Sequence, residues 1–135
     1  MSVFLFFIFH WYLSLFFQTF FLHRYASHGM YKLNNFWERA FYLLTFIFQG
    51  SSFLHPAAYA VMHRRHHIYA DTDQDPHSPV HVNNIIDFNR KTFNEYRNIV
   101  KEFSENQMKV RDVPRWPFME KIAESYLVRI LFVFI

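Results

Sequence analysis

The sequence lacks cysteine altogether and contains only 2 glycines among its 135 residues. Without cysteine, disulfide frameworks, cysteine-ligated zinc or iron–sulfur sites and thiol catalysis are all excluded. Charged residues are also scarce, at 19% of the chain, whereas apolar residues make up 52% and aromatic residues 22%. This bias is typical of a chain that faces lipid rather than of a disordered one.

Acidic and basic side chains are missing from the first 23 positions, and all of them lie at Arg24 or later. The uncharged run over residues 3–22 is long enough to cross a hydrocarbon core of about 30 Å as a helix. A signal peptide would need a basic start, a shorter apolar core and a small-residue cleavage site, none of which is present. We therefore predict a transmembrane helix over residues 3–22.

The formal net charge is only +3, and the sequence has no lysine-rich block. This balance favours a surface next to lipid and argues against a nucleic acid partner. Basic residues gather on the cytoplasmic side of membrane proteins. The chain that follows Arg24 is therefore predicted to be cytoplasmic.

Histidine is the residue type with the most informative pattern. His23 and His28 form one group, and His63, His66 and His67 form a second group within five residues. Imidazole nitrogen binds iron, zinc and copper, and five imidazoles exceed what one structural zinc needs. A single histidine is more often a surface or interfacial residue that binds nothing. Two groups that flank an apolar segment instead favour a metal centre.

The spacing inside each group predicts its geometry. On a helix, His63, His66 and His67 stand at i, i+3 and i+4 and share one side, so two can bind one metal while the third reaches a neighbouring ion. His23 and His28 are about 140° apart on an ideal α-helix. We expect these two to bind different metals or to lie where the helix frays. Together the five side chains favour a dinuclear centre.

A second apolar segment covers residues 36–54 and is interrupted by polar side chains. If both histidine groups serve one centre, they must lie on the same side of the membrane. The 34 residues between His28 and His63 cannot supply two crossings of about 20 residues each, and one crossing would separate the groups. We therefore predict that residues 36–54 dip into or lie along the cytoplasmic interface.

The remaining residues are predicted to be mostly helical, which makes the fold class all-α and integral to the membrane. Residues 1–135 are expected to be the N-terminal part of a single membrane domain. The predicted segments are an extended loop over 71–79, an amphipathic helix from 86 to about 110, a break at Pro114 and Pro117, a helix from near Glu120 that completes the cytoplasmic helices over 86–125, and the start of a further transmembrane helix over 126–135.

The pattern His23-x4-His28, then 34 residues, then His63-x2-His66-His67 with the tail Tyr69-Ala70-Asp71-Thr72-Asp73-Gln74-Asp75-Pro76-His77-Ser78-Pro79 resembles the membrane fatty acid desaturases. The acyl-CoA, delta-9-type branch is the most similar, over roughly residues 9–79. The resemblance implies a centre of two irons on the cytoplasmic side that activates O₂ and places a cis double bond in a saturated acyl-CoA or acyl lipid. Electrons would come from a b-type cytochrome or a ferredoxin. By position, His23, His28, His63, His66 and His67 would be the metal ligands.

The resemblance also has a gap. The family has a further His-x2-His-His group downstream, and no histidine follows His81 in this sequence. Five ligands are too few for the complete centre. The chain is therefore expected to be an incomplete part of an enzyme, with the activity of this part alone left open.

Carboxylates follow the second histidine group. Asp71, Asp73 and Asp75 are expected to accept N–H bonds from the histidines and to fix their tautomers, as outer-sphere partners of metal ligands commonly do. A calcium loop is excluded, because Pro76 stands where such a loop needs glycine.

Other polar residues near the groups have two readings. Arg24, Arg64 and Arg65 meet the phosphates of CoA or of a lipid head group, or they only extend to the membrane interface. His77 is expected to support the site or the substrate head group rather than to bind metal.

Three other functions compete with a desaturase. A hydroxylase or ketolase on a similar histidine scaffold would give an oxygenated product. A membrane electron carrier would bind b-type haem through His10 and His23, which lie 13 residues apart, although no second helix offers a matching pair. A non-catalytic remnant would bind metal weakly.

Overall fold

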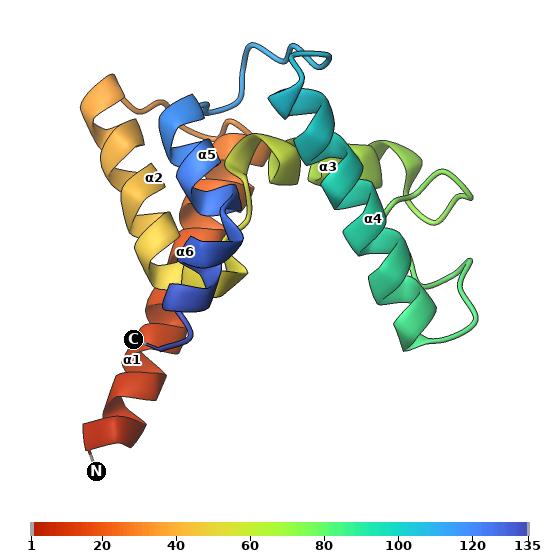
Figure 1. Cartoon of the computed structure of the whole chain (residues 1–135). Coiled ribbons are helices and arrows are strands. Elements are labelled where there is room, and N and C mark those ends of the chain that lie inside the picture. The colour runs from red at the N-terminus through yellow and green to blue at the C-terminus, as the bar shows by residue number, and fades with distance from the viewer. Residues whose placement is uncertain (1, 135) are drawn as a thin grey trace.

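The computed structural model describes residues 2–134, and every regular element in this part of the chain is a helix (Figure 1). The prediction of an all-α fold is confirmed. The elements are α1 (Ser2–Phe17), η1 (Gln18–Ser27), α2 (Asn35–Gln49), η2 (Gly50–Ser52), α3 (Pro56–Tyr69), α4 (Ile85–Ser104), α5 (Pro117–Glu124) and α6 (Tyr126–Leu131).

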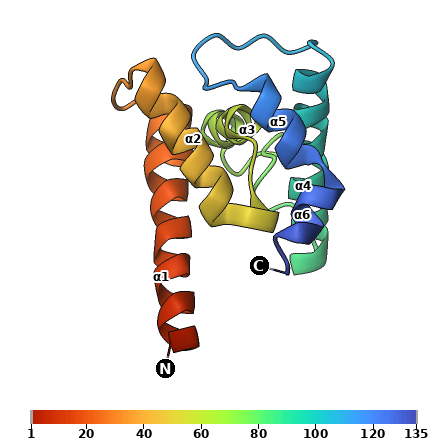
Figure 2. The same cartoon turned by 60° about the vertical axis from the view of Figure 1, so that its left-hand side comes forward.

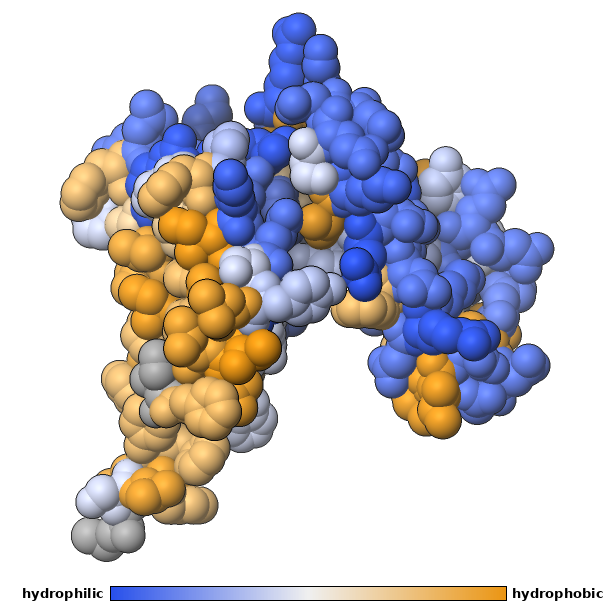
Figure 3. All heavy atoms as spheres, in the orientation of Figure 1, coloured by the Kyte–Doolittle hydropathy of each residue, from blue (hydrophilic) through white to orange (hydrophobic). Residues whose placement is uncertain are grey.

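Helices α1 and η1 form one continuous rod whose first half projects from the rest of the protein (Figures 1 and 2). Within residues 2–134, this rod is the one helix long and apolar enough to cross a membrane. Most side chains of its first half, α1, are exposed, with Phe4 at 68% and Trp11 at 65%, and Figure 3 shows an apolar surface over this part of the molecule. A helix with apolar residues all round is stable in lipid but not in water.

Helix α2 runs back along the rod (Figure 2). The Asn34 side chain caps its first turn by accepting the Trp37 N–H at 3.0 Å, and the Phe48 ring stacks on Phe17 with 5.2 Å between centroids. The helix ends at Gly50, whose φ of +53° is a conformation that glycine tolerates best. The chain then returns through η2 toward the η1 end of the rod, where α2 began. Both histidine groups consequently lie at the same end of the rod, as a shared site requires.

Helix α3 lies across that end of the rod (Figure 1). It begins after His55, whose Nδ1 accepts the Ala58 N–H at 3.2 Å. Ala57, Ala58 and Ala60 are fully buried and pack in one cluster with Ala26 of η1. Small side chains allow two helix backbones to approach closely, and this contact brings the two histidine groups together.

Two helix boundaries differ from the sequence-based expectation. Helix α4 ends at Ser104 rather than near residue 110, because Asn106 takes a left-handed conformation with φ +55° that ends an α-helix. Helix α5 begins at Pro117 rather than near Glu120, since proline fits the first turn of a helix, where its missing N–H is not needed. Residues 105–116 form the connection.

A buried ionic network joins the start of α3 to α5. Glu120 accepts two hydrogen bonds from Arg115, at 2.8 and 2.9 Å, and His55 Nε2 lies 3.3 Å from its carboxylate. Burial alone would raise the pKa of Glu120, but the His55 and Arg115 hydrogen bonds prevail and lower it to about 2. The carboxylate is therefore ionised at neutral pH.

Candidate metal centre

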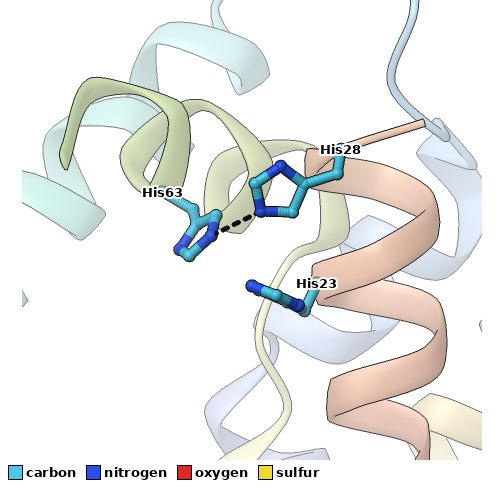
Figure 4. Close-up of side chains that lie close together, drawn as sticks. All are labelled: His23, His28 and His63. Atoms are coloured by element: carbon cyan, nitrogen blue, oxygen red, sulfur yellow. Dashed lines mark hydrogen bonds between the residues drawn. The ribbon is translucent and has the colours of Figure 1, made fainter. Parts of the chain in front are cut away.

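Imidazole rings from both histidine groups converge at the junction of η1 and α3 (Figure 4). One ligand nitrogen from each of His23, His28 and His63 lies within 4.8 Å of the others. The ring centroids of His23 and His28 are 4.6 Å apart, and the His67 centroid lies 4.6 Å from that of His63. We refer to His23, His28, His63 and His67 as the imidazole cluster.

The separation of about 140° expected for His23 and His28 on an ideal α-helix does not apply, because η1 is a π-helix. His28 is the C-cap of this helix, which agrees with the alternative that the pair lies at a helix end. In a π-helix each N–H bonds to the carbonyl five residues earlier, so residues five apart stand above one another. The His28 N–H accordingly lies 3.2 Å from the His23 carbonyl oxygen. The π-helix places both rings on one face, and rings on one face can bind the same ion.

The contribution of α3 comes from residues four apart, which share a helix face. His63 Nε2 lies 3.0 Å from His28 Nε2 and 3.0 Å from His67 Nε2. Burial, followed by repulsion from the neighbouring imidazoles, lowers the pKa of His63 to about 4. The pKa of His28 is lowered for the same two reasons. Where such nitrogens point at one another, either the Nε2–H of one neutral ring donates to the lone pair of its neighbour or a cation lies between the rings.

His66 turns away from the imidazole cluster toward the loop that follows α3. Its Nδ1 lies 2.9 and 3.0 Å from the two carboxylate oxygens of Asp75, and its ring centroid is 6.5 Å from that of His63. A carboxylate on Nδ1 keeps the proton there and leaves the Nε2 lone pair free for a metal. His66 is thus close to the cluster but oriented separately.

Asp75 is the best-buried carboxylate of the tail. It has no exposed surface and also accepts the backbone N–H of Asp71 at 2.9 Å and of His77 at 2.8 Å. Burial alone would raise its pKa, yet the hydrogen bonds from His66, His77 and Asp71 lower it below its ordinary value. The side chain is therefore a fixed anion within hydrogen-bonding distance of His66.

The other two aspartates pair with residues outside the two histidine groups. Asp71 accepts the Ser78 hydroxyl at 2.8 Å, and Asp73, with 91% of its side chain exposed, pairs with His81. His77 Nδ1 lies 3.3 Å from the Thr92 hydroxyl on α4, and burial lowers its pKa.

The three arginines have three different surroundings. Arg24 is exposed on η1. Arg64 donates to the Ser27 and Ala26 carbonyls of η1 and forms an ion pair with Asp112. Arg65 forms an ion pair with Glu95 on α4.

Two further residues near the site become evident in the structure. The Tyr59 ring stacks on His63, with centroids 5.7 Å apart and planes 7° apart, and Gln18 lies with Tyr59 in the lining of a cavity beside His63. Tyr59 is four residues before His63, a spacing that could have been noticed in the sequence. Gln18 is a polar residue within the predicted membrane span, where polar side chains are often functional. His10 stacks on Phe6 with centroids 5.8 Å apart, whereas His23 lies in the imidazole cluster.

A cavity of about 670 Å³ opens beside His63. Its lining comes from η1, α3, α4 and the adjoining segments, namely Gln18, Leu54, Tyr59, Met62, His63, His77, Asn89, Arg90, Thr92, Phe93 and Tyr96. His63 is the one residue of the imidazole cluster in this lining. An apolar ligand in the cavity would lie directly beside the cluster.

Comparison with known proteins decides the family. A family model described as fatty acid desaturase matches residues 1–133. The chain belongs to the fatty acid desaturase family. This membrane-bound family includes the Arabidopsis thaliana proteins named Delta-9 desaturase-like 3 and Delta-9 desaturase-like 1, and each is 41% identical to this desaturase-family chain over 63 residues. A third relative, Delta-9 desaturase-like 5 of the same plant, is 38% identical over 63 residues.

These alignments cover 46% of the desaturase-family chain and 20% of each relative. The matched segment is thus about one fifth of the length of the curated relatives. No solved structure matches the chain. The family model, rather than a structural likeness, therefore carries the assignment, and the resemblance noted from the histidine spacing is confirmed.

Proposed function

We propose that this chain supplies part of an iron-dependent fatty acyl desaturase that places a cis double bond in a saturated acyl chain. The observation that carries the proposal is the meeting of His23, His28, His63 and His67, from two segments far apart in the sequence, beside an apolar cavity. His66, fixed by Asp75, supplies a fifth imidazole next to the cluster.

The donor set fits iron. All five proposed ligands are imidazoles, a donor suited to iron, copper and zinc, and burial and mutual repulsion keep His63 neutral, with its lone pair free. A closed structural zinc site would need four ligands around one ion. The four clustered rings and the separately oriented His66 make five donors, which is more than one such site takes. Five donors in this arrangement suit two adjacent ions. We propose His23, His28, His63, His66 and His67 as ligands of a two-iron centre.

When bound, iron would supply the activation of O₂, and the overall reaction would convert one saturated acyl chain, O₂, two electrons and two protons into an unsaturated chain and two waters. The protein residues orient the reactants. Asp75 holds the proton on His66 Nδ1, while Tyr59 fixes the plane of the His63 ring. Met62 and Leu54 of the cavity lining exclude water from the acyl chain.

The cavity beside His63 is the proposed acyl site. A volume of about 670 Å³ is within the range of ligand pockets, roughly 300–1,000 Å³. Arg90 is part of its lining and is a candidate contact for the polar head of an acyl thioester or acyl lipid. We propose that the chain enters from the bilayer, with the histidines on the cytoplasmic side and electrons delivered by a b-type cytochrome or ferredoxin.

The test is iron content and product analysis in the detergent-purified chain. Iron should be lost when His63→Ala is combined with His67→Ala and retained in His81→Ala, because His81 pairs with Asp73 outside the cluster. An unsaturated product from a saturated acyl substrate would support a desaturase, whereas a hydroxylated product would indicate the hydroxylase or ketolase. Retention of iron in the double variant would overturn the ligand assignment, and substoichiometric iron in the wild type would indicate a weakly binding remnant.

A further inference from the structure

Arg64 connects the backbones of the two histidine groups. Its Nε donates to the Ser27 carbonyl at 2.6 Å, one terminal nitrogen donates to the Ala26 carbonyl at 3.1 Å, and the other donates to Asp112 at 2.8 Å. We propose that Arg64 is a positioning residue that holds η1 in its π-helical form and thereby keeps His23 and His28 on one face. This inference rests on the proposed metal centre.

The two carbonyls belong to the last turn of η1. In a π-helix they would accept N–H groups from residues 31 and 32, but the helix ends at Ser27 and those residues lie outside it. Carbonyls at a helix end have no intrahelical partner and carry negative partial charge. Ala26 and Ser27 are also buried, at 0% and 3% exposure, so water has little access to replace a lost donor. The Arg64 guanidinium supplies the missing hydrogen bonds and a compensating charge.

The contact lies next to the ligands in both segments. Ser27 precedes His28 and Arg64 follows His63, and the Nε2 atoms of those two histidines are 3.0 Å apart. A π-helix is rare because its hydrogen bonds compete with those of an α-helix. If the last turn relaxed to α-helical geometry, His23 and His28 would be about 140° apart. The Arg64 contact therefore acts on the orientation of the first histidine group.

Arg65 provides a matched comparison on the same helix turn. It is also an arginine with a carboxylate partner, Glu95, but that partner belongs to α4 rather than to η1. Lysine cannot reproduce the planar fork through which Arg64 reaches two carbonyls and Asp112 at once. A glutamine at position 64 removes both the charge and the fork, whereas a lysine keeps the charge and removes only the fork. Comparison of the two variants therefore separates the effect of the charge from that of the geometry.

The experiment uses the full chain in detergent, as wild type, Arg64→Gln, Arg64→Lys and Arg65→Gln. Cobalt(II), followed by its visible absorption, is the metal probe, and hydrogen exchange is measured for a peptide covering residues 22–30. We expect cobalt binding to weaken about 10- to 100-fold in Arg64→Gln, the range typical for loss of an outer-sphere partner. The loss should be smaller in Arg64→Lys and below about twofold in Arg65→Gln. Exchange in residues 22–30 should be faster in Arg64→Gln without metal.

The outcomes separate this inference from the proposed function. If the wild type binds cobalt, and Arg64→Gln has the same cobalt affinity and the same exchange rate, the positioning role is overturned and the metal centre stands. Absence of cobalt binding by the wild type would overturn both. If Arg64→Gln does not fold, as judged by helical circular dichroism, Arg64→Lys decides: affinity within about twofold of Arg65→Gln would overturn the inference.

Discussion

Replacement of Asp75 by asparagine tests how the loop after α3 prepares the metal centre. The carboxylate is fully buried and accepts hydrogen bonds from His66 Nδ1, the Asp71 N–H and the His77 N–H. Asparagine has nearly the same shape but turns one of the two acceptor oxygens into a donor. One of the backbone N–H groups would then face another N–H group.

The size of the effect follows from these contacts. Leaving one buried donor unsatisfied costs about 1–3 kcal/mol of folding free energy. The amide no longer provides the negative charge that favours a proton on His66 Nδ1, so the Nε2 lone pair becomes a weaker metal ligand. Loss of such a partner typically lowers metal affinity about 10- to 100-fold. Asp73→Asn is the matched control, since that side chain is 91% exposed and pairs with His81 instead.

Cobalt titration and urea unfolding of the detergent-solubilised chain measure the two quantities. A cycle with His66→Ala adds a sharper criterion: if Asp75 acts through His66, Asp75→Asn should not weaken metal binding further when His66 is alanine. Equal affinities for Asp75→Asn and Asp73→Asn would refute the reasoning. The reasoning would also be refuted if Asp75→Asn lowered the cobalt affinity as much in the His66→Ala background as in the wild type.

Three further predictions concern other parts of the chain. Because the pKa of Glu120 is lowered from 4.5 to about 2, its ionised form stabilises the fold by about 3 kcal/mol above pH 4.5. The stability difference between wild type and Glu120→Gln, measured by urea unfolding, should shrink as the pH falls from 4.5 toward 2, and a constant difference would contradict the assignment. Gly50→Ala should destabilise the chain by about 1–3 kcal/mol, because φ is +53° and a Cβ would lie 3.2 Å from the Phe132 ring; an unchanged thermal midpoint would count against it. Asn89→Trp, at the acyl cavity, should weaken the binding of a fluorescent fatty acid and leave cobalt binding intact, whereas Asn98→Trp, outside that cavity, should change neither.

The sequence alone determined the family and the class of fold. The uncharged run before His23 required a helix suited to lipid, and imidazole groups at repeated spacing indicated a metal centre of the desaturase type before any geometry was known. The family assignment and the all-α architecture agree with this prediction. Residue type and spacing suffice for such conclusions because they depend on side-chain chemistry and on local helix periodicity.

Tertiary structure decided which side chains meet. An ideal α-helix would turn His23 and His28 apart, and only the π-helical form of η1 places them on one face. Asp71, Asp73 and Asp75 are chemically equal in the sequence, yet of the three the fold of the loop brings only Asp75 to a residue of the two histidine groups, His66. The role of Arg64 was equally undetermined, since its backbone partners are 37 and 38 positions away in the chain. Helix type and contacts between distant residues depend on packing energies summed over the whole fold, which local sequence patterns do not contain.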